Sequence, residues 1–142
     1  MQPRDEAWPH LSTRIRPLGA PPHDGPAVRT SAEAREATRR RLASIRPVNR
    51  SQVDDLMLVV SELVTNAERH AGGVTGFRLD LARDSATVSV TDGSREPPTY
   101  RRSEDLTPGG YGWPIVLRLC REVIVSVHAA GKTIRAVVPL EQ

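Results

Sequence analysis

The chain has 142 residues, of which 38% are hydrophobic and 26% are charged, and its formal net charge is +3. This length can bury one hydrophobic core but not two, so it predicts a single domain. No run approaches the roughly 18 apolar residues that span a bilayer, and the first residues lack a signal peptide's apolar stretch, so we expect a cytoplasmic protein without a membrane segment. A lone cysteine, Cys120, excludes an internal disulfide and a four-cysteine zinc site.

The basic balance of charge raises the question of a nucleic-acid partner. The chain has 20 basic residues against 17 acidic ones, but no segment combines basic and aromatic side chains as a nucleic-acid surface does. The run Arg39, Arg40 and Arg41 is better explained as a solvated helix face. Direct DNA binding therefore has only the net charge in its favour, and we expect no nucleic-acid partner.

Residues 1–26 are predicted to be an extended arm, because their proline density excludes a helix. Only residues 11–16 alternate enough to form a short edge strand. The prolines are Pro3, Pro9, Pro17, Pro21, Pro22 and Pro26.

Residues 27–142 are predicted to form the domain, which begins with two helices. The first covers residues 27–45, and Pro47 stops it. Its apolar side carries Ala34, Thr38, Leu42 and Ile45. The second starts near Ser51, where Asp54 three residues later suggests a capping box, and it ends at Gly72 and Gly73. Its apolar stripe contains Leu56, Val59, Val60, Leu63, Val64, Ala67 and Ala71.

The remaining elements are strands, a long loop and a short helix. Alternating residues 77–81 and 87–91 predict two paired strands. Residues 93–110 have no periodicity and carry three prolines, so we expect a lid-like loop. A short helix follows, with Ile115, Val116, Leu119 and Cys120 on its apolar side, and residues 123–127 and 133–138 predict a final hairpin. Hairpins combined with helices predict a two-layer α+β sandwich, whose mainly antiparallel sheet is covered on one face.

Glu62, Asn66 and His70 are spaced four apart on the second helix and line one edge of its apolar stripe. We expect His70 to tilt toward the apolar side. An amide oxygen suits magnesium, and a neighbouring carboxylate can accept a proton from a hydroxyl or water. The alternative is that all three are ordinary polar residues of an exposed helix face.

Asp92 ends the second predicted strand on the face that carries Val88 and Val90, so its carboxylate should point to the buried side. A buried carboxylate needs a hydrogen-bond donor, and the amino group of adenine would supply one. Gly93 would let a flat base approach the backbone. The alternative is a simple Asp-Gly-Ser turn at the strand end.

Two glycine motifs occur in the second half of the chain. Gly109, Gly110, Tyr111 and Gly112 directly precede a helix, where backbone N–H groups and the helix dipole attract phosphate. Residues 131–133 read Gly-Lys-Thr, but a P-loop needs a glycine where this chain has Ser126, and it precedes a helix rather than a strand. We therefore reject a P-loop here, and we expect Thr133 to direct its hydroxyl into the same pocket as Asp92.

These motifs resemble the GHKL superfamily, which includes gyrase, the large heat-shock chaperone, histidine kinases and mismatch-repair ATPases. The resemblance is greatest to bacterial anti-sigma-factor serine kinases and covers about residues 27–140. It is carried by residues 61–67 with His70, followed by Asp92, the glycine cluster and Thr133. It implies the Bergerat ATP-binding fold, with ATP and Mg²⁺ as cofactors.

The resemblance also implies a role for each matching residue. Glu62 matches the general base, and Asn66 matches the magnesium ligand. Asp92 matches the aspartate that binds the adenine amine, and Thr133 matches the threonine that assists it. His70 matches a position near the phosphates. The phosphate-binding glycine box matches Gly110 and Gly112, with Gly109 and Tyr111 beside them.

Two hypotheses follow from this resemblance. In the first, the chain is a serine kinase that phosphorylates an anti-anti-sigma protein of the STAS type and also binds a sigma factor. The resemblance implies a homodimer for this form. In the second, it is a catalytically silent module that acts only by protein contact. The second is motivated by Trp113 and Pro114 at the helix start and by the lack of a second glycine after Gly93.

Overall fold

The computed structural model describes residues 13–17, 28–96, 98 and 112–142. Within these residues, five strands and three helices follow one another in the order β1, α2, α3, β2, β3, α4, β4, β5. The helices are α2 (Ser31–Leu42), α3 (Arg50–His70) and α4 (Gly112–Leu119). The strands are β1 (Thr13–Pro17), β2 (Val74–Leu81), β3 (Ser85–Asp92), β4 (Glu122–His128) and β5 (Gly131–Pro139).

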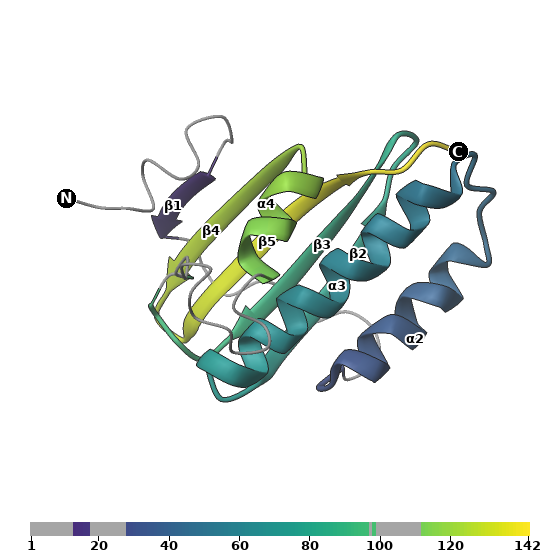
Figure 1. Cartoon of the computed structure of the whole chain (residues 1–142). Helices are drawn as coiled ribbons and strands as arrows, with labels where there is room; N and C mark the ends of the chain where they lie inside the picture. The colour runs from purple at the N-terminus through teal and green to yellow at the C-terminus, as the bar shows by residue number, and fades with distance from the viewer. Residues whose placement is uncertain (1–12, 18–27, 97, 99–111) are drawn as a thin grey trace, which may run out of the picture.

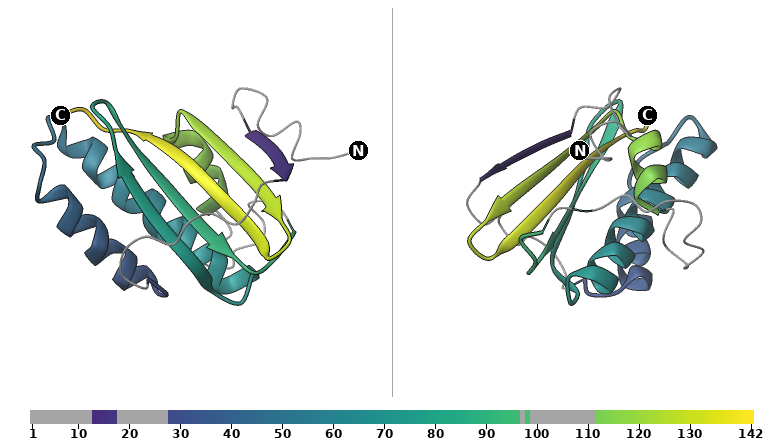
Figure 2. Two further views of the ribbon diagram at one scale, coloured as in Figure 1. Left: turned by 180° about the vertical axis from the view of Figure 1, so that it is seen from behind. Right: turned by 60° about the vertical axis from the view of Figure 1, so that its left-hand side comes forward.

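One mixed sheet in the order β1-β4-β5-β3-β2 forms the first layer of the fold. β1 pairs with β4 in parallel, and the other neighbouring strands are antiparallel. The described helices lie together on one face of this sheet and form the second layer (Figures 1 and 2). The predicted two-layer α+β sandwich is confirmed, and the predicted edge strand is β1.

α3 is the central helix of the second layer. It crosses β3 and β5, with α2 along one flank and α4 along the other (Figure 1). Ala71 of the predicted stripe is only partly buried and caps the end of the helix. The buried residues of α3 are the other six, namely Leu56, Val59, Val60, Leu63, Val64 and Ala67. They meet the sheet face formed by alternate residues of β3, β4 and β5, including Val88, Val90, Val123, Val125, Ile134 and Ala136. One apolar interface therefore holds the two layers together.

The bounds of α2 and the cap of α3 differ from those predicted. α2 begins at Ser31, where Thr30 and Glu33 form a reciprocal capping box, and the backbone N–H groups of Arg29 and Thr30 donate to the Glu33 carboxylate at 3.0 and 3.1 Å. These bonds lower the pKa of Glu33. The capping box predicted at Ser51 is wrong, because Asn49 caps α3 by accepting from the Ser51 N–H at 2.9 Å.

The buried face of α4 agrees only in part with the one predicted, because Val116 and Cys120 are buried but Leu119 is only partly so. Trp113, Val116, Leu117 and Cys120 are buried, whereas Ile115 is only partly buried. Nearly every residue of this eight-residue helix is apolar, so its sequence does not define one face, and contact with α3 decides which side is buried. Burial raises the pKa of the Cys120 thiol to about 12, which agrees with the predicted packing role.

The hairpin between β4 and β5 explains the glycine of the Gly-Lys-Thr sequence. His128 pairs with Gly131, which leaves Ala129 and Ala130 as a two-residue turn. Gly131 has φ of 148°, and a Cβ atom there would collide with the Asp92 carbonyl oxygen of the neighbouring strand. Gly131 therefore allows β5 to approach the end of β3. A strand follows this glycine rather than the helix of a P-loop, which agrees with the rejection of that motif.

The α3 interface predicts an unequal response to one substitution at two sites. Leu63→Ala should lower the free energy of unfolding by about 2–5 kcal/mol, because Leu63 is 1% exposed and its loss leaves a cavity. Leu58→Ala on the same helix is the control, since Leu58 is 39% exposed, and it should change stability by about 0.5 kcal/mol or less. Urea unfolding measures both, and equal losses would contradict the packing described.

Candidate functional site

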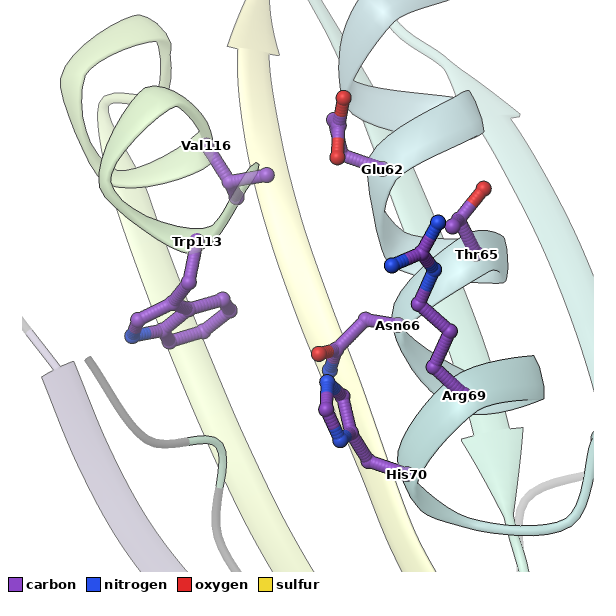
Figure 3. A pocket seen from close by; sticks show the side chains of 7 residues that line it. All are labelled: Glu62, Thr65, Asn66, Arg69, His70, Trp113 and Val116. Carbon is purple, nitrogen blue, oxygen red and sulfur yellow. The ribbon is translucent and has the colours of Figure 1, made fainter. Parts of the chain in front are cut away.

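A small open pocket lies between α3 and α4, and we call it the α3–α4 pocket. It is lined by Glu62, Thr65, Asn66, Arg69, His70, Trp113 and Val116. Five of these residues come from successive turns at the end of α3, and the other two come from the facing side of α4 (Figure 3). The predicted row of Glu62, Asn66 and His70 therefore lines one pocket, while Thr65 and Arg69 were not predicted.

Glu62 combines a charge with partial burial. Desolvation by burial raises the pKa of its carboxyl above the usual 4.5, and the nearby Arg69 guanidinium acts in the opposite direction. In the part of the chain that the structure describes, the Glu62 carboxylate accepts no hydrogen bond. It is thus a carboxylate with open acceptor positions and an increased affinity for a proton.

Asn66 and His70 lie beside each other on the α3 wall of the pocket, with the indole of Trp113 across from them (Figure 3). Asn66 is partly buried, and within the described residues its amide makes no hydrogen bond. His70 is exposed, which corrects the expected tilt toward the apolar side, because it is the last residue of α3. Asn66 therefore presents to the pocket an amide oxygen of the kind that hard cations bind.

The phosphate-binding prediction is only partly covered by the described residues. Gly109, Gly110 and Tyr111 lie outside them, as does most of the predicted lid. Gly112 is the first residue of α4, so the predicted helix start after the glycine cluster is confirmed. Trp113, next to it, is 6% exposed and forms the α4 wall of the pocket together with Val116.

Asp92 lies at the end of β3 on the helix-covered face of the sheet and is 1% exposed. Lys132 Nζ, itself in a side chain only 4% exposed, lies 3.0 Å from both carboxylate oxygens. The Ser94 backbone N–H donates to Oδ1 at 2.8 Å. The predicted burial of this carboxylate is confirmed, and the donors that satisfy it come from the chain itself.

Lys132 was not predicted as a site residue. It occupies the position directly opposite Asp92 in the antiparallel pairing of β3 with β5. Directly paired residues share a face of the sheet, so the two side chains meet. Removing one partner of a buried ion pair costs about 3–5 kcal/mol, because the other charge is left uncompensated. The sequence signal for this pair was only that Lys132 is the chain's single lysine.

The structure does not bring Thr133 together with Asp92, which corrects the expectation of a shared pocket. Thr133 pairs with Thr91, and their hydroxyl oxygens are 2.9 Å apart. His128 Nε2 is 3.3 Å from the same Thr133 oxygen. Neighbouring residues of a strand point to opposite faces, so Thr133 and Lys132 cannot face the same layer. A role for Thr133 in nucleotide binding stays a prediction.

Comparison with known proteins fits this architecture. The two-layer sandwich with helices on one face is that of an ATPase-type domain. Residues 26–138 match the histidine kinase-like ATPase domain, and since this match covers most of the chain, the protein belongs to that family. A search of curated proteins gives no match. No helix in the described ranges is long and apolar enough to cross a membrane.

The raised pKa of Glu62 predicts a pH-dependent effect of its removal. The folded state binds this proton more tightly than the unfolded state, so the stability linked to Glu62 is complete below pH 4.5 and is lost as pH rises through the folded pKa. Glu62→Gln should therefore unfold at a higher temperature than the unchanged protein at pH 7, and this gain should disappear near pH 4.

Glu68→Gln is the matched control, because Glu68 lies on the exposed side of the same helix. Thermal unfolding between pH 4 and pH 8 measures all three proteins. Equal gains from both substitutions would attribute the effect to the net charge of the helix rather than to burial of Glu62.

Proposed function

We propose that this protein binds ATP with magnesium in the α3–α4 pocket and acts as a serine protein kinase of the anti-sigma-factor type. Family membership supports a nucleotide-binding role. The observation that carries the rest is the joint placement of Glu62 and Asn66 on one wall of that pocket, both partly buried and, among the described residues, without hydrogen-bond partners.

The residues of the pocket fit the metal and phosphate end of such a ligand. Asn66 offers an amide oxygen, and magnesium is commonly held by one or two protein oxygens together with phosphate oxygens and water. Arg69 adds a positive charge to the same wall. Within the described residues no group of three His, Cys, Asp or Glu side chains gathers, so phosphate oxygens would supply most of the ligands. Bound magnesium would neutralise charge on the phosphates.

Glu62 is the residue we propose as the general base. It would accept the proton of a serine hydroxyl on the partner protein as that oxygen attacks phosphorus. Its raised pKa increases its basicity, and a base is most effective when its pKa approaches the working pH. Arg69, which opposes this shift, would keep Glu62 ionised and ready to accept the proton.

The proposed partners come from the resemblance rather than from a surface of this structure. The substrate would be an anti-anti-sigma protein of the STAS type, and the protein sequestered would be a sigma factor. Both would be met in the cytoplasm, and a homodimer would be the assembled form. Transcription would then be controlled by competition between these partners.

A specific observation favours a second function, that of a module which regulates by protein contact without nucleotide. The Asp92 carboxylate, which matches the residue that binds adenine, is already held by Lys132 and by the Ser94 N–H. The α3–α4 pocket also does not include Asp92. A module that never opens this end of the site would retain the fold and lose nucleotide binding.

Asn66→Ala tests the proposed metal site. The substitution removes the amide oxygen, so affinity for ATP measured with magnesium by calorimetry should fall at least about tenfold, which corresponds to about 1.4 kcal/mol. The same titration with EDTA should already be weak in the unchanged protein. Glu68→Gln serves as the control on the exposed side of α3 and should bind normally. Unchanged binding by Asn66→Ala would remove Asn66 as the metal ligand.

Glu62→Gln separates catalysis from binding. Transfer of labelled phosphate from ATP to serine of the STAS-type protein from the same cell should fall by about 10²–10⁴-fold, because a general base contributes that much. Affinity for ATP should stay within a fewfold of that of the unchanged protein. The kinase proposal would be abandoned if phosphoserine formed at the same rate in the variant, or if ATP bound tightly and no phosphoserine formed in either protein.

A further inference from the structure

The ion pair of Asp92 and Lys132 lies on the helix-covered face of the sheet, beyond the residues that line the α3–α4 pocket. Asp92 follows Val90 by two residues on β3, and Lys132 precedes Ile134 by two on β5, so the pair extends the buried row of core residues. Both side chains are almost completely buried, with 4% of Lys132 and 1% of Asp92 exposed. The core therefore ends in a desolvated pair of opposite charges.

The acceptor capacity of Asp92 is largely used within the chain. Lys132 Nζ contacts both oxygens at 3.0 Å, and the Ser94 N–H donates to Oδ1 at 2.8 Å. An ionised carboxylate has about four acceptor positions, and the small exposure of Asp92 leaves none of them accessible to a ligand. A base whose amino group binds Asp92 thus has no route to it while Lys132 stays in place.

The amino group of a base cannot simply take the place of the Lys132 ammonium at Asp92, because the two donors differ in charge. An exocyclic amino group is neutral, whereas Lys132 is an ammonium ion, so a base that replaced it would leave the lysine charge without its counterion. Lys132 must therefore move to a polar environment when a base binds. Lys132 lies two residues after the exposed turn of Ala129 and Ala130, and its side chain is long and flexible, so it can turn toward solvent at this end of the sheet.

We propose that Lys132 is an internal occupant of the base subsite, so that a nucleotide binds only when Lys132 leaves Asp92 and becomes exposed to solvent. This inference rests on the proposed function and adds a residue that sets affinity for the base. The apparent dissociation constant of the nucleotide then equals its intrinsic value divided by the fraction of molecules in which Lys132 is displaced. The ligand class is a nucleotide whose base donates an amino group to Asp92.

Replacing Lys132 tests the effect on affinity. Lys132→Thr removes the competing ammonium and should bind ATP with magnesium at least about tenfold more tightly than the unchanged protein in calorimetry. Arg135→Thr is the matched control, because it removes a cation from the same strand at an exposed position. It should bind ATP as the unchanged protein does.

A second measurement uses the unchanged protein and does not depend on how a variant folds. Lys132 is the only lysine of the chain, so an amine-reactive acetylating reagent reports on this residue and the N-terminal amine alone. Mass spectrometry should find Lys132 protected in the free protein and acetylated several times faster with saturating ATP and magnesium. The N-terminal amine serves as the internal reference and should react at the same rate in both samples.

The outcomes separate this inference from the proposed function. The inference is supported if Lys132→Thr binds ATP more tightly and ATP speeds acetylation of Lys132 in the unchanged protein. It is also supported if Lys132→Thr binds ATP and the unchanged protein does not. If the unchanged protein binds ATP while Lys132 stays protected, or if Lys132→Thr binds no more tightly, the inference is wrong and the proposed function stands. If neither protein binds ATP, the proposed function fails and the inference fails with it.

Discussion

The packing of the apolar stripe of α3 against β3 and β5 is the interaction on which the rest of the structure depends. This contact joins the helical layer to the sheet, and it also fixes the rotation of α3 about its own axis. With Leu63, Val64 and Ala67 turned into the core, Glu62 and Asn66 must lie at the border of the stripe, where burial is partial. The chemistry of the candidate site is thus a consequence of core packing.

Partial burial gives these two polar residues their chemical character. A carboxylate in full contact with water would keep its ordinary affinity for protons, and one without any solvent would need a fixed partner. Glu62 lies between these limits, with burial raising its pKa and Arg69 limiting the rise. Asn66, one turn further along, faces α4 across the same pocket. The border of a buried helix stripe therefore suits a site that must bind a charged ligand and release it.

The two ends of the site are in different states. The α3–α4 pocket is open beside Glu62 and Asn66, whereas Asp92 is enclosed with Lys132 in a desolvated ion pair. An enclosed pair resists removal of either partner, so the enclosed end responds to a ligand only by moving the lysine. If a base binds at Asp92 as proposed, its binding would be coupled to a change in exposure of the Lys132 side chain. The register of β3 and β5 brings the two side chains together, and their burial on the helix-covered face makes the pair costly to separate.

The sequence by itself determined the helix and strand order, the apolar stripe of α3 and the row of Glu62 and Asn66, because these follow from local periodicity. It also placed Asp92 on the buried face by alternation from Val88 and Val90. Only the tertiary structure decided that Lys132 pairs with Asp92 and that Thr133 faces the other way, because strand register is set by contacts between residues 40 positions apart. The buried side of α4 was likewise decided by α3, since a short helix of mostly apolar residues has no preferred face of its own.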